Sequence, residues 1–449
     1  MMEVPRILSV IGLGKLGAPM AACLAAKGFE VIGVDVDPHK VDAVNRQEAP
    51  VYEPGLAELL RSHGERLRAT TNLEAAVAQS DATFIVVPTP SEPDGSFSLR
   101  YIVQACDGIA KALRQKETWH LVVVTSTISP LSMDTVIKPY LEEHSGKRCG
   151  KEFGLCYSPE FIALGSVIHD FLNPDFILIG ESDQKSGEVL ATIYKQVCDN
   201  DPPVARMNFV NAELTKLAVN TFVTTKISFA NMLARICERL PGADVDVVTQ
   251  ALGLDSRIGR KYLKGAVSYG GPCFPRDNLA LIALARQIGA PADIAETTDR
   301  FNRWQVQWLA DVVQRHLGDS GVVGILGLTY KPNTDVVDES VGILLAEELA
   351  SRGISVVAYD PAGNGNAERV LGERVQFAET AQNCVAQADV VVIATPWSEF
   401  SSLPTEAWAR HSRERIVIDC WRVLNNLKEC EGVEYIPLGV FGPLFATDF

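Results

Sequence analysis

Two stretches far apart in the chain share one pattern, and this repeat limits the fold more than any other feature. Each has an apolar run, a glycine turn, a helical segment ending in glycine, and a second apolar run ending in aspartate, at residues 7–35 and 322–360. The helix-ending glycine and the aspartate have the same spacing in both, Gly28 to Asp35 and Gly353 to Asp360. Apolar strands separated by helices are typical of a parallel sheet covered on both faces. The repeat, whether from duplication or convergence, predicts an α/β protein with two doubly wound domains.

Composition is that of an ordinary globular protein and excludes some partners. The 449 residues, 47% hydrophobic and 22% charged, suggest two or three domains. A net charge of −15 argues against nucleic acid or an anionic membrane as partner. No apolar run reaches membrane-spanning length, and the first residues do not resemble a signal peptide. The ten cysteines include no C-x-x-C pair, so we expect a reduced, cytoplasmic chain that binds no metal.

A different pattern lies between the two repeats. Residues 211–239 contain neither glycine nor proline, and apolar residues recur there at helical spacing until Pro241 and Gly242. We expect one long helix within a helical region that joins the two domains. Its apolar face favours a homodimer, and a spacer within one chain is the alternative. The expected domains are residues 1–205, 206–305 and 306–449.

The first repeat carries a dinucleotide-binding fingerprint. Gly12-Leu13-Gly14-Lys15-Leu16-Gly17 follows a strand and opens a helix, and Asp35 ends the next strand. The glycines allow a tight turn, approach of a pyrophosphate, and close helix–strand packing, while the helix N-terminus attracts phosphate. Asp35 would bind the adenosine ribose, which favours NAD over NADP, although nearby Lys40 complicates that inference. A glycine-rich turn with no ligand is the alternative.

The second repeat keeps less of this fingerprint. It retains Gly324 and Gly327 but has Tyr330 and Lys331 where a third glycine would stand. We therefore expect it not to bind a whole dinucleotide. Lys331 could instead balance the charge of a different phosphate.

Residues 269–277 contain a candidate nucleophile, Cys273. Paired glycines precede it, prolines stand on both sides of the Cys-Phe step, and Arg276 and Asp277 follow. Such a loop holds a side chain in place, and a neighbouring cation favours thiolate. A buried cysteine in a tight turn is the alternative, since most cysteines outside disulfides simply pack.

Taken together, these segments resemble the nucleotide-sugar 6-dehydrogenases, the UDP-glucose and GDP-mannose dehydrogenase family. The resemblance covers nearly the whole chain and extends to further motifs. These are Val87–Pro90 with Asp94-Gly95, Thr125–Ile128, Ser158–Phe161, Asn211–Asn220, Arg257–Gly259 and Gly327–Asp335.

The resemblance implies four-electron oxidation of a primary alcohol to an acid, with two NAD⁺ reduced per product. Cys273 would add to the intermediate aldehyde, and loss of a second hydride would leave a thioester for water to hydrolyse. Lys216 and Asn220, four residues apart on one helix face, suit a donor pair for an oxyanion. Glu160 resembles the base for hydrolysis, with Asp277 and Thr127 as its partners. Without the resemblance, Lys216, Asn220 and Glu160 would be read as surface residues.

The resemblance also implies binding residues. Besides the fingerprint, the cofactor would contact Pro88, Thr89, Thr127, Glu160 and Arg276. The nucleotide sugar would contact Phe161, Ile162, Ala163, Leu164, Lys216, Asn220, Arg257, Tyr262, Leu263, Lys264, Tyr269, Gly270, Tyr330 and Lys331. Arg257 could reach the site of a neighbouring subunit or be a plain surface residue.

Some positions depart from the family's usual residues. Leu164 replaces a polar residue, Pro272 a serine and Arg276 a lysine, and Asp338 and Trp421-Arg422 alter usual arginine positions. They leave the nucleophile, base and helix donors intact, so they bear on substrate identity more than on reaction type. We expect UDP-glucose as substrate. A UDP-N-acetylhexosamine or another nucleotide-diphosphate hexose, a two-electron β-hydroxyacid dehydrogenase, and a non-catalytic nucleotide sensor are the alternatives.

Overall fold

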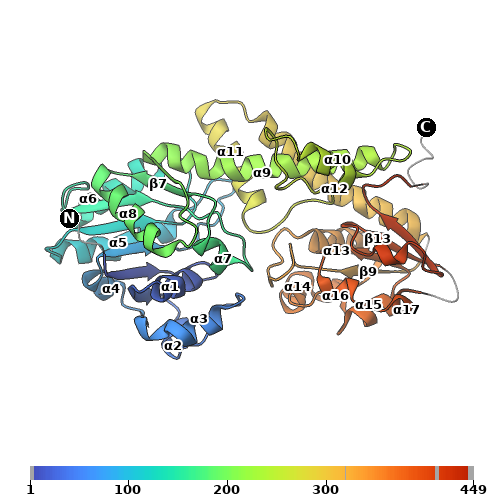
Figure 1. Cartoon of the computed structure of the whole chain (residues 1–449), viewed down its shortest axis with the longest axis horizontal. Coiled ribbons are helices and arrows are strands. Elements are labelled where there is room, and N and C mark those ends of the chain that lie inside the picture. The colour runs from blue at the N-terminus through green and yellow to red at the C-terminus, as the bar shows by residue number, and fades with distance from the viewer. Residues whose placement is uncertain (1–4, 319, 410–413, 443–449) are drawn as a thin grey trace. The chain divides into compact units, whose positions relative to one another are not determined.

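The computed structural model describes residues 5–318, 320–409 and 414–442, and the chain divides into two compact units, Met1–Ala218 and Val219–Phe449 (Figure 1). Each unit contains one twisted sheet with helices on both faces. The predicted pair of doubly wound α/β domains is thereby confirmed. No helix among the described residues is both long and apolar enough to cross a membrane.

The sheet of the first unit has eight strands in the order β3-β2-β1-β4-β5-β6-β7-β8. The strands are β1 (Ile7–Ile11), β2 (Glu30–Val34), β3 (Leu67–Thr70), β4 (Ala82–Ile85), β5 (His120–Val124), β6 (Phe153–Tyr157), β7 (Ile177–Glu181) and β8 (Val204–Met207). One pair departs from the expected parallel arrangement, because β6 and β7 are antiparallel. Antiparallel neighbours need no crossover helix, and residues 158–176 between them form a loop carrying only the short helix α7 (Val167–Leu172).

Two apolar cores cover the two faces of this sheet. Leu8 and Val10 face one core and Ile11 the other, as expected for side chains that alternate along a strand. The helices are α1 (Gly17–Ala26), α2 (Pro38–Asn45), α3 (Leu56–His63), α4 (Leu73–Gln79), α5 (Arg100–Gln115), α6 (Lys138–Ser145), α7 and α8 (Gln184–Val197). Helices α1, α3, α7 and α8 contribute to the first core, and α4, α5 and α6 to the second.

The second unit holds a six-stranded parallel sheet in the order β11-β10-β9-β12-β13-β14. Its strands are β9 (Val322–Leu326), β10 (Ser355–Tyr359), β11 (Gln376–Phe377), β12 (Val390–Ile393), β13 (Arg415–Asp419) and β14 (Val433–Pro437). The order around β9 repeats the order around β1, which agrees with the repeat seen in the sequence. Its covering helices are α13 (Val341–Ser351), α14 (Asn364–Leu371), α15 (Ala381–Gln387), α16 (Ser398–Ser401) and α17 (Thr405–Trp408).

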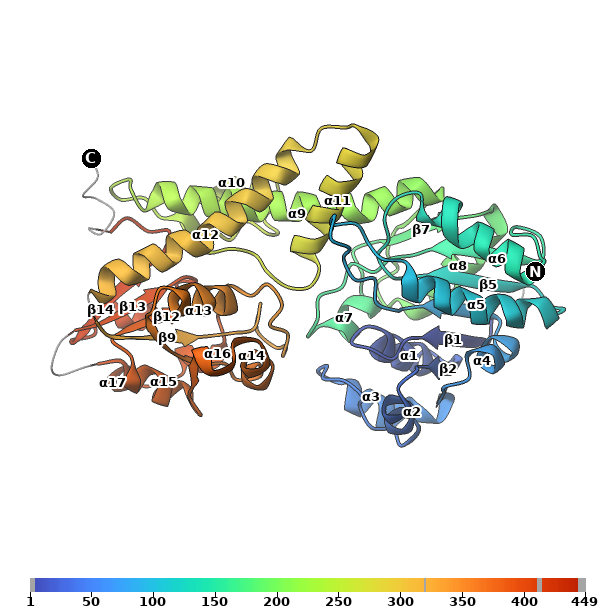
Figure 2. The same ribbon diagram turned by 180° about the vertical axis from the view of Figure 1, so that it is seen from behind.

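A single helix of 29 residues, α9 (Phe209–Cys237), leads from the first unit into the second. The expected long helix is thus present and begins two residues before Asn211. After it come α10 (Val245–Leu252), α11 (Phe274–Ile288) and α12 (Asp293–Leu317). Helix α12 packs on α11 and α13 (Figure 2).

Candidate active site

The fingerprint glycines of the first unit are required by the backbone that surrounds them. Gly12 has a φ of +100°, and a Cβ there would lie 2.3 Å from the carbonyl oxygen of Val86. A Cβ at Gly17 would lie 1.8 Å from the carbonyl oxygen of Gly12, whereas one at Gly14 would meet nothing within 4 Å. Gly12 and Gly17 therefore allow close packing, and Gly14 keeps open the side from which a ligand can approach.

The charges around this turn fit a dinucleotide. Helix α1 begins here without a side-chain cap, so its N-terminal end can attract phosphate. Asp35, buried at the end of β2, accepts hydrogen bonds from the backbone N–H of Leu13 at 2.7 Å and of Asp37 at 2.9 Å. Lys40 Nζ lies 3.4 Å from the same carboxylate. A carboxylate fixed in this way is suited to ribose hydroxyls and repels a 2′-phosphate.

Other residues expected at the cofactor are distributed along the neighbouring strand ends. Thr89, which is buried, donates a hydrogen bond from its hydroxyl to the backbone oxygen of Thr127 at 2.8 Å. This bond brings two of the predicted cofactor residues together. Pro88 beside them is exposed.

The corresponding aspartate of the second unit, Asp360, already accepts hydrogen bonds from residues of its own unit. Asp360 Oδ2 accepts hydrogen bonds from Leu328 N, Thr329 N, Thr329 Oγ1 and the indole N–H of Trp397, at 2.7 to 3.1 Å. A Cβ at Gly327 would lie 2.5 Å from Thr395. A ribose would have to displace the indole, so this arrangement supports the expectation that the second repeat does not bind a whole dinucleotide.

Glu160 lies just after β6, in the connection between the two antiparallel strands. Burial of its carboxyl group raises the pKa of Glu160 to about 7, against the lowering effects of a hydrogen bond from Tyr194 and of the nearby Lys216 charge. Lys216 is buried, and its Nζ donates to the backbone oxygen of Glu160 at 2.6 Å. The same ammonium lies 4.5 Å from the ring centre of Phe161. The first unit thus brings together Glu160, Phe161 and Lys216.

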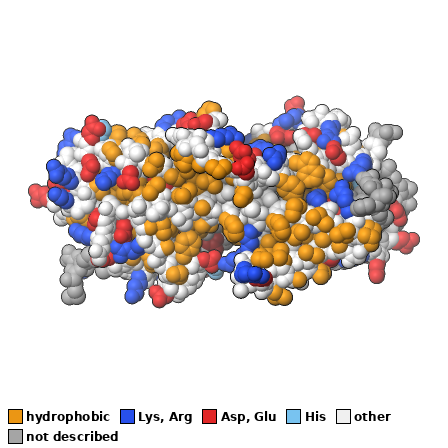
Figure 3. Space-filling model, turned by 90° about the horizontal axis from the view of Figure 1, so that it is seen from above, with side chains coloured by type: hydrophobic (Ala, Val, Ile, Leu, Met, Phe, Trp, Pro, Cys, Tyr) orange, Lys and Arg blue, Asp and Glu red, His pale blue; other side chains and the backbone are white. Residues whose placement is uncertain are grey.

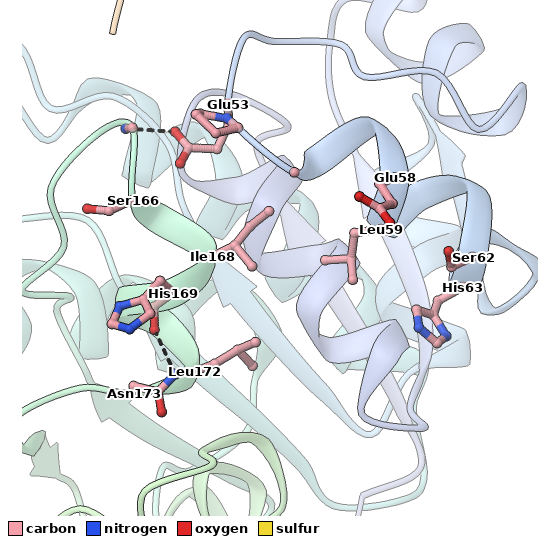
Figure 4. Close-up of a pocket in the computed structure, with 13 residues that line it drawn as sticks. Glu53, Glu58, Leu59, Ser62, His63, Ser166, Ile168, His169, Leu172 and Asn173 are labelled. Carbon is pink, nitrogen blue, oxygen red and sulfur yellow. Dashed lines mark hydrogen bonds between the residues drawn. The ribbon is translucent and has the colours of Figure 1, made fainter. Parts of the chain in front are cut away.

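The rest of this loop is held by a residue that the sequence analysis did not single out, Glu53. Its buried carboxylate accepts hydrogen bonds from the backbone N–H of Gly165 at 2.9 Å and of Val167 at 2.8 Å. Figure 4 shows Glu53 at the edge of a pocket of about 620 Å³ between α3 and α7. Glu53 lies 112 residues from Gly165 in sequence, so local patterns could not reveal the pairing.

The second unit places Cys273 immediately before α11, with its side chain exposed. The alternative of a buried, packing cysteine is therefore wrong. The positive end of a helix dipole favours an anion such as a thiolate. One turn into the helix, Asp277 is buried and its Oδ2 accepts a hydrogen bond from Asn220 Nδ2 at 2.6 Å. Arg276 Nε lies 3.9 Å from the other oxygen of Asp277.

Lys216 and Asn220 occupy consecutive turns of α9. Each makes a hydrogen bond, Lys216 to Glu160 and Asn220 to Asp277. An ammonium has three N–H groups and a carboxamide two, so these bonds leave further donors to each residue. Both side chains are at least nine-tenths buried, which strengthens a donor's electrostatic effect.

Two asparagines fix the loop that precedes the cysteine. Asn231 accepts from Ala266 N and donates to the oxygen of Val267, both at 2.7 Å. Asn302 accepts from Tyr269 N at 2.8 Å and donates to the oxygen of Tyr269 at 2.9 Å. Both asparagines are buried. Their only sequence signal is a polar residue within the apolar face of a helix, which does not reveal its partner.

The same loop contacts the segment after β9. A Cβ at Gly271, whose φ is +88°, would lie 2.7 Å from the ring of Tyr330. Gly271 N donates to the backbone oxygen of Asp338 at 2.9 Å, and a Cβ at Gly270 would lie 2.1 Å from the backbone oxygen of Glu339. The paired glycines therefore bring Tyr330 against the cysteine loop. Lys331 lies 5.9 Å from the ring centre of Tyr330.

The remaining predicted substrate residues are more dispersed. Arg257 is exposed and pairs with Asp255 of its own turn at 2.6 Å, while Tyr262, also exposed, packs edge-on against Phe274. Leu263 is buried, and Lys264 pairs with Asp246 at 3.3 Å. Ile162 and Leu164 are half-buried and Ala163 is exposed.

The departing residues near the C-terminus have clear structural partners. Trp421 donates its indole N–H to the oxygen of Ala394 at 2.8 Å. Arg422 is buried and donates to both carboxylate oxygens of Asp246 at 2.8 and 2.9 Å, and to the oxygen of Gly265 at 2.6 Å. Arg422 therefore ties the end of β13 to α10 and to the loop before the cysteine.

Comparison with known proteins identifies the family. Models of the UDP-glucose/GDP-mannose dehydrogenase family match its NAD binding domain over residues 6–198, its central domain over 210–304 and its UDP binding domain over 324–426. A UDP-glucose 6-dehydrogenase of Haloferax volcanii is 39% identical over 95% of this chain and 99% of its own length. A GDP-mannose 6-dehydrogenase of Azotobacter vinelandii is 35% identical over 88% of this chain and 93% of its own length.

A solved structure agrees with these relatives. The UDP-glucose dehydrogenase of Pyrobaculum islandicum is 36% identical, with a TM-score of 0.89 over 98% of each chain. These matches confirm the resemblance inferred from the motifs. An α/β chain with a dinucleotide fingerprint in its first unit and an exposed cysteine at a helix start in its second thus belongs to the UDP-glucose/GDP-mannose dehydrogenase family and is an NAD-dependent dehydrogenase.

Proposed function

We propose that this protein oxidises the C6 alcohol of a nucleotide-diphosphate sugar to the acid, with UDP-glucose as substrate and UDP-glucuronate as product. The observation that carries the proposal is Cys273, exposed at the N-terminal end of α11 in a chain that matches the whole family. Two relatives named as UDP-glucose 6-dehydrogenases, at 39% and 34% identity, support the choice of sugar nucleotide.

The proposed chemistry assigns a separate task to each group. Bound NAD⁺ supplies a hydride acceptor for each of the two oxidations. After the first, the thiolate of Cys273 adds to the aldehyde carbon, and the resulting alkoxide is stabilised by donors from Lys216 and Asn220. Loss of the second hydride from this thiohemiacetal leaves a thioester. Glu160 then takes a proton from water as its oxygen attacks the thioester carbon, and the C–S bond breaks to release the acid.

The nucleotide is assigned to the backbone after Glu160 and to the loop before Cys273. Lys331 would balance the diphosphate charge, and Tyr330, packed on Gly271, would line the same region. Arg257 is exposed and pairs with its neighbour Asp255. We assign this exposed guanidinium to the site of a second subunit. The reduced cytoplasm would keep the thiol of Cys273 active.

A UDP-N-acetylhexosamine or another nucleotide-diphosphate hexose is the second candidate. It is favoured by Leu164 and Trp421, which replace polar residues usual in the family. The test is to measure NADH release with UDP-, GDP- and dTDP-sugars. UDP-glucose should give the highest kcat/KM and two NADH per sugar. One NADH per sugar would indicate a two-electron dehydrogenase, and no turnover with any of them would contradict the proposal.

We further propose that the protein is a homodimer through α9. Five apolar side chains of this helix are exposed, namely Leu214, Phe222, Phe229, Met232 and Ile236. At about 100° per residue they share one face, opposite Lys216 and Asn220. Figure 3 shows hydrophobic side chains gathered along the side of the molecule that carries α9. An apolar stripe of this kind suits burial against a second copy.

A further inference from the structure

A chain of hydroxyl groups leads from Glu160 into the core of the first unit. The hydroxyl of Tyr194 in α8 lies 3.0 Å from Glu160 Oε1. Ser158 Oγ lies 3.1 Å from the hydroxyl oxygen of Tyr194 and 2.9 Å from the backbone oxygen of Leu178 in β7. Tyr194 and Ser158 are 3% and 1% exposed. Solvent therefore has little access to the two inner groups.

The number of available hydrogens determines the direction of the hydrogen bond at each of the three contacts. Each hydroxyl supplies one hydrogen, and the oxygen of Leu178 can only accept. With Glu160 ionised, two hydrogens are available for three contacts, and Tyr194 must direct its own toward the carboxylate. With Glu160 protonated, a third hydrogen fills every contact, and each bond points away from Glu160 toward Leu178. Adding one proton to Glu160 thus reverses the hydrogen bond between Tyr194 and Glu160, while Ser158 keeps donating to Leu178.

We propose that Tyr194, backed by Ser158, is a positioning residue that keeps Glu160 hydrogen-bonded in both protonation states by reversing its own hydrogen bond. The inference rests on the proposed role of Glu160 as the base for thioester hydrolysis. In that step the water O–H bond breaks, the oxygen bonds to the thioester carbon, and the proton goes to Glu160. The two hydroxyls only rotate. The proton then passes to sulfur as the C–S bond breaks.

The groups around Glu160 have opposing effects on its pKa. A hydrogen-bond partner that serves both protonation states is therefore useful. Burial raises the pKa of Glu160 to about 7, and the Tyr194 hydrogen bond and the Lys216 charge from α9 lower it. Cys198, just after α8, also faces the carboxylate, and burial followed by the Glu160 charge raises the pKa of that thiol to about 11. A base that is half-ionised near neutral pH must be held equally well before and after it takes a proton.

Packing of the apolar core does not explain why residue 194 is a tyrosine. Its neighbours on the same face of α8 are Leu190, Ile193 and Val197, all buried and apolar. A phenylalanine would fill the same space without a buried hydroxyl to satisfy. The hydroxyl is accounted for by its two partners, Ser158 and Glu160.

The test uses two single substitutions that should shift the pH profile in opposite directions. Tyr194→Phe also removes one bond from the ionised chain and two from the protonated chain, but the bond lost from the ionised chain is charge-assisted and its loss leaves a buried negative charge without that donor. The protonated form therefore gains relative stability, and thioester hydrolysis should need higher pH, by up to about one unit. Ser158→Ala removes one hydrogen bond from the ionised chain but two from the protonated chain. The ionised form gains relative stability, and the acidic limb should move to lower pH.

Hydrolysis is followed directly in the full-length protein. The protein is mixed with UDP-glucose and NAD⁺, quenched at intervals from pH 5.5 to 8.5, and the mass of the Cys273 adduct is read by intact-protein mass spectrometry. Opposite shifts, with KM for UDP-glucose unchanged, support the proposal. Shifts of the same sign, or none in either variant, would overturn it.

Two controls separate this proposal from others. Tyr435→Phe removes a hydroxyl that bonds a carboxylate in the second unit, Asp419 at 2.9 Å, and should leave the pH profile unchanged. If the unaltered protein forms no adduct at Cys273 and releases no NADH, the proposed function itself fails. If Tyr194→Phe does not fold, the downward shift expected of Ser158→Ala still decides the matter.

Discussion

At the scale of single residues, Cys273 has the position that a nucleophile needs. It is exposed at the start of α11, beside the buried pair of Asn220 and Asp277. In this environment the thiol is accessible while the groups behind it are held in place. Substitution of Cys273 tests whether this geometry serves covalent chemistry.

Cys273→Ser should stop acid formation while leaving binding intact. A neutral hydroxyl is a weak nucleophile at its ordinary pKa, so we expect uronate formation to fall by about 100-fold or more. Rapid-mixing measurements should show at most one NADH per site. Cys430→Ser, at a half-buried cysteine of the same unit, should behave like the unaltered protein. Undiminished uronate formation by Cys273→Ser would rule out the thioester.

Glu213 offers a residue-scale test of pH-dependent stability. It is fully buried and accepts hydrogen bonds from the backbone N–H of Leu131 and Met133. Burial raises the pKa of Glu213 to about 7 from an ordinary 4.5, although the two N–H groups lower it. The folded state therefore holds a proton that the unfolded state releases between these values. The stabilisation of the folded state by protonated Glu213 is fully present below pH 4.5 and is lost as the pH rises through 7.

Glu213→Gln removes this titration. Between pH 4.5 and 7, the free energy of unfolding of the unaltered protein should fall relative to the variant by roughly 1.4 kcal/mol per pH unit. Urea unfolding of both proteins at pH 5 and 8 measures the difference. If the two proteins differed by the same free energy of unfolding at pH 5 and at pH 8, Glu213 would not titrate in this range.

At the scale of elements, one distant carboxylate helps to hold the β6–β7 connection. Glu53 holds the backbone of Gly165 and Val167 through two charge-assisted hydrogen bonds (Figure 4). The same connection carries Glu160 and the residues proposed to bind the nucleotide sugar. The loop is therefore positioned by the segment that leads into α3 as well as by hydrogen bonds within its own sequence, such as that from Ala163 N to Asp170.

Glu53→Gln keeps one acceptor oxygen but turns an N–H₂ group toward the backbone N–H groups. We expect a loss of about 1–3 kcal/mol in stability and a several-fold higher KM for UDP-glucose, with the KM for NAD⁺ nearly unchanged. Steady-state kinetics and thermal unfolding measure both effects. Glu58→Gln, on the exposed rim of the same pocket, is the matched control. Equal KM values for the two variants would show that the loop does not need Glu53.

At the scale of the whole molecule, the proposed function gives α9 two tasks, one on each of two opposite faces. One face carries Lys216 and Asn220 and the other an exposed apolar stripe. Each unit has its own sheet, and the proposed homodimer would bury the stripe against a second copy. Charges placed on the stripe should prevent it.

The double substitution Phe222→Glu with Phe229→Glu should convert the dimer to a monomer, because two carboxylates would be buried beside their copies. Light scattering coupled to size-exclusion chromatography measures the mass directly. Val370→Glu, at a 47% exposed apolar residue of α14, should leave the mass unchanged. A dimer that survives the double substitution would place the interface elsewhere.

The features that could be predicted from the sequence were those that depend on residues close together along the chain. Apolar runs, helix-ending glycines and the residue period determined the two α/β units and α9, because these signals act over a few residues. The cysteine loop and the fingerprint were recognisable for the same reason: their glycines and prolines restrict the backbone locally. The antiparallel β7, the hold of Glu53 on Gly165, the asparagine contacts to residues 266–269 and the Glu160–Tyr194–Ser158 chain arose only in the tertiary structure. Each joins groups far apart along the chain, and a buried hydrogen bond selects its partner by position in space rather than by order in sequence.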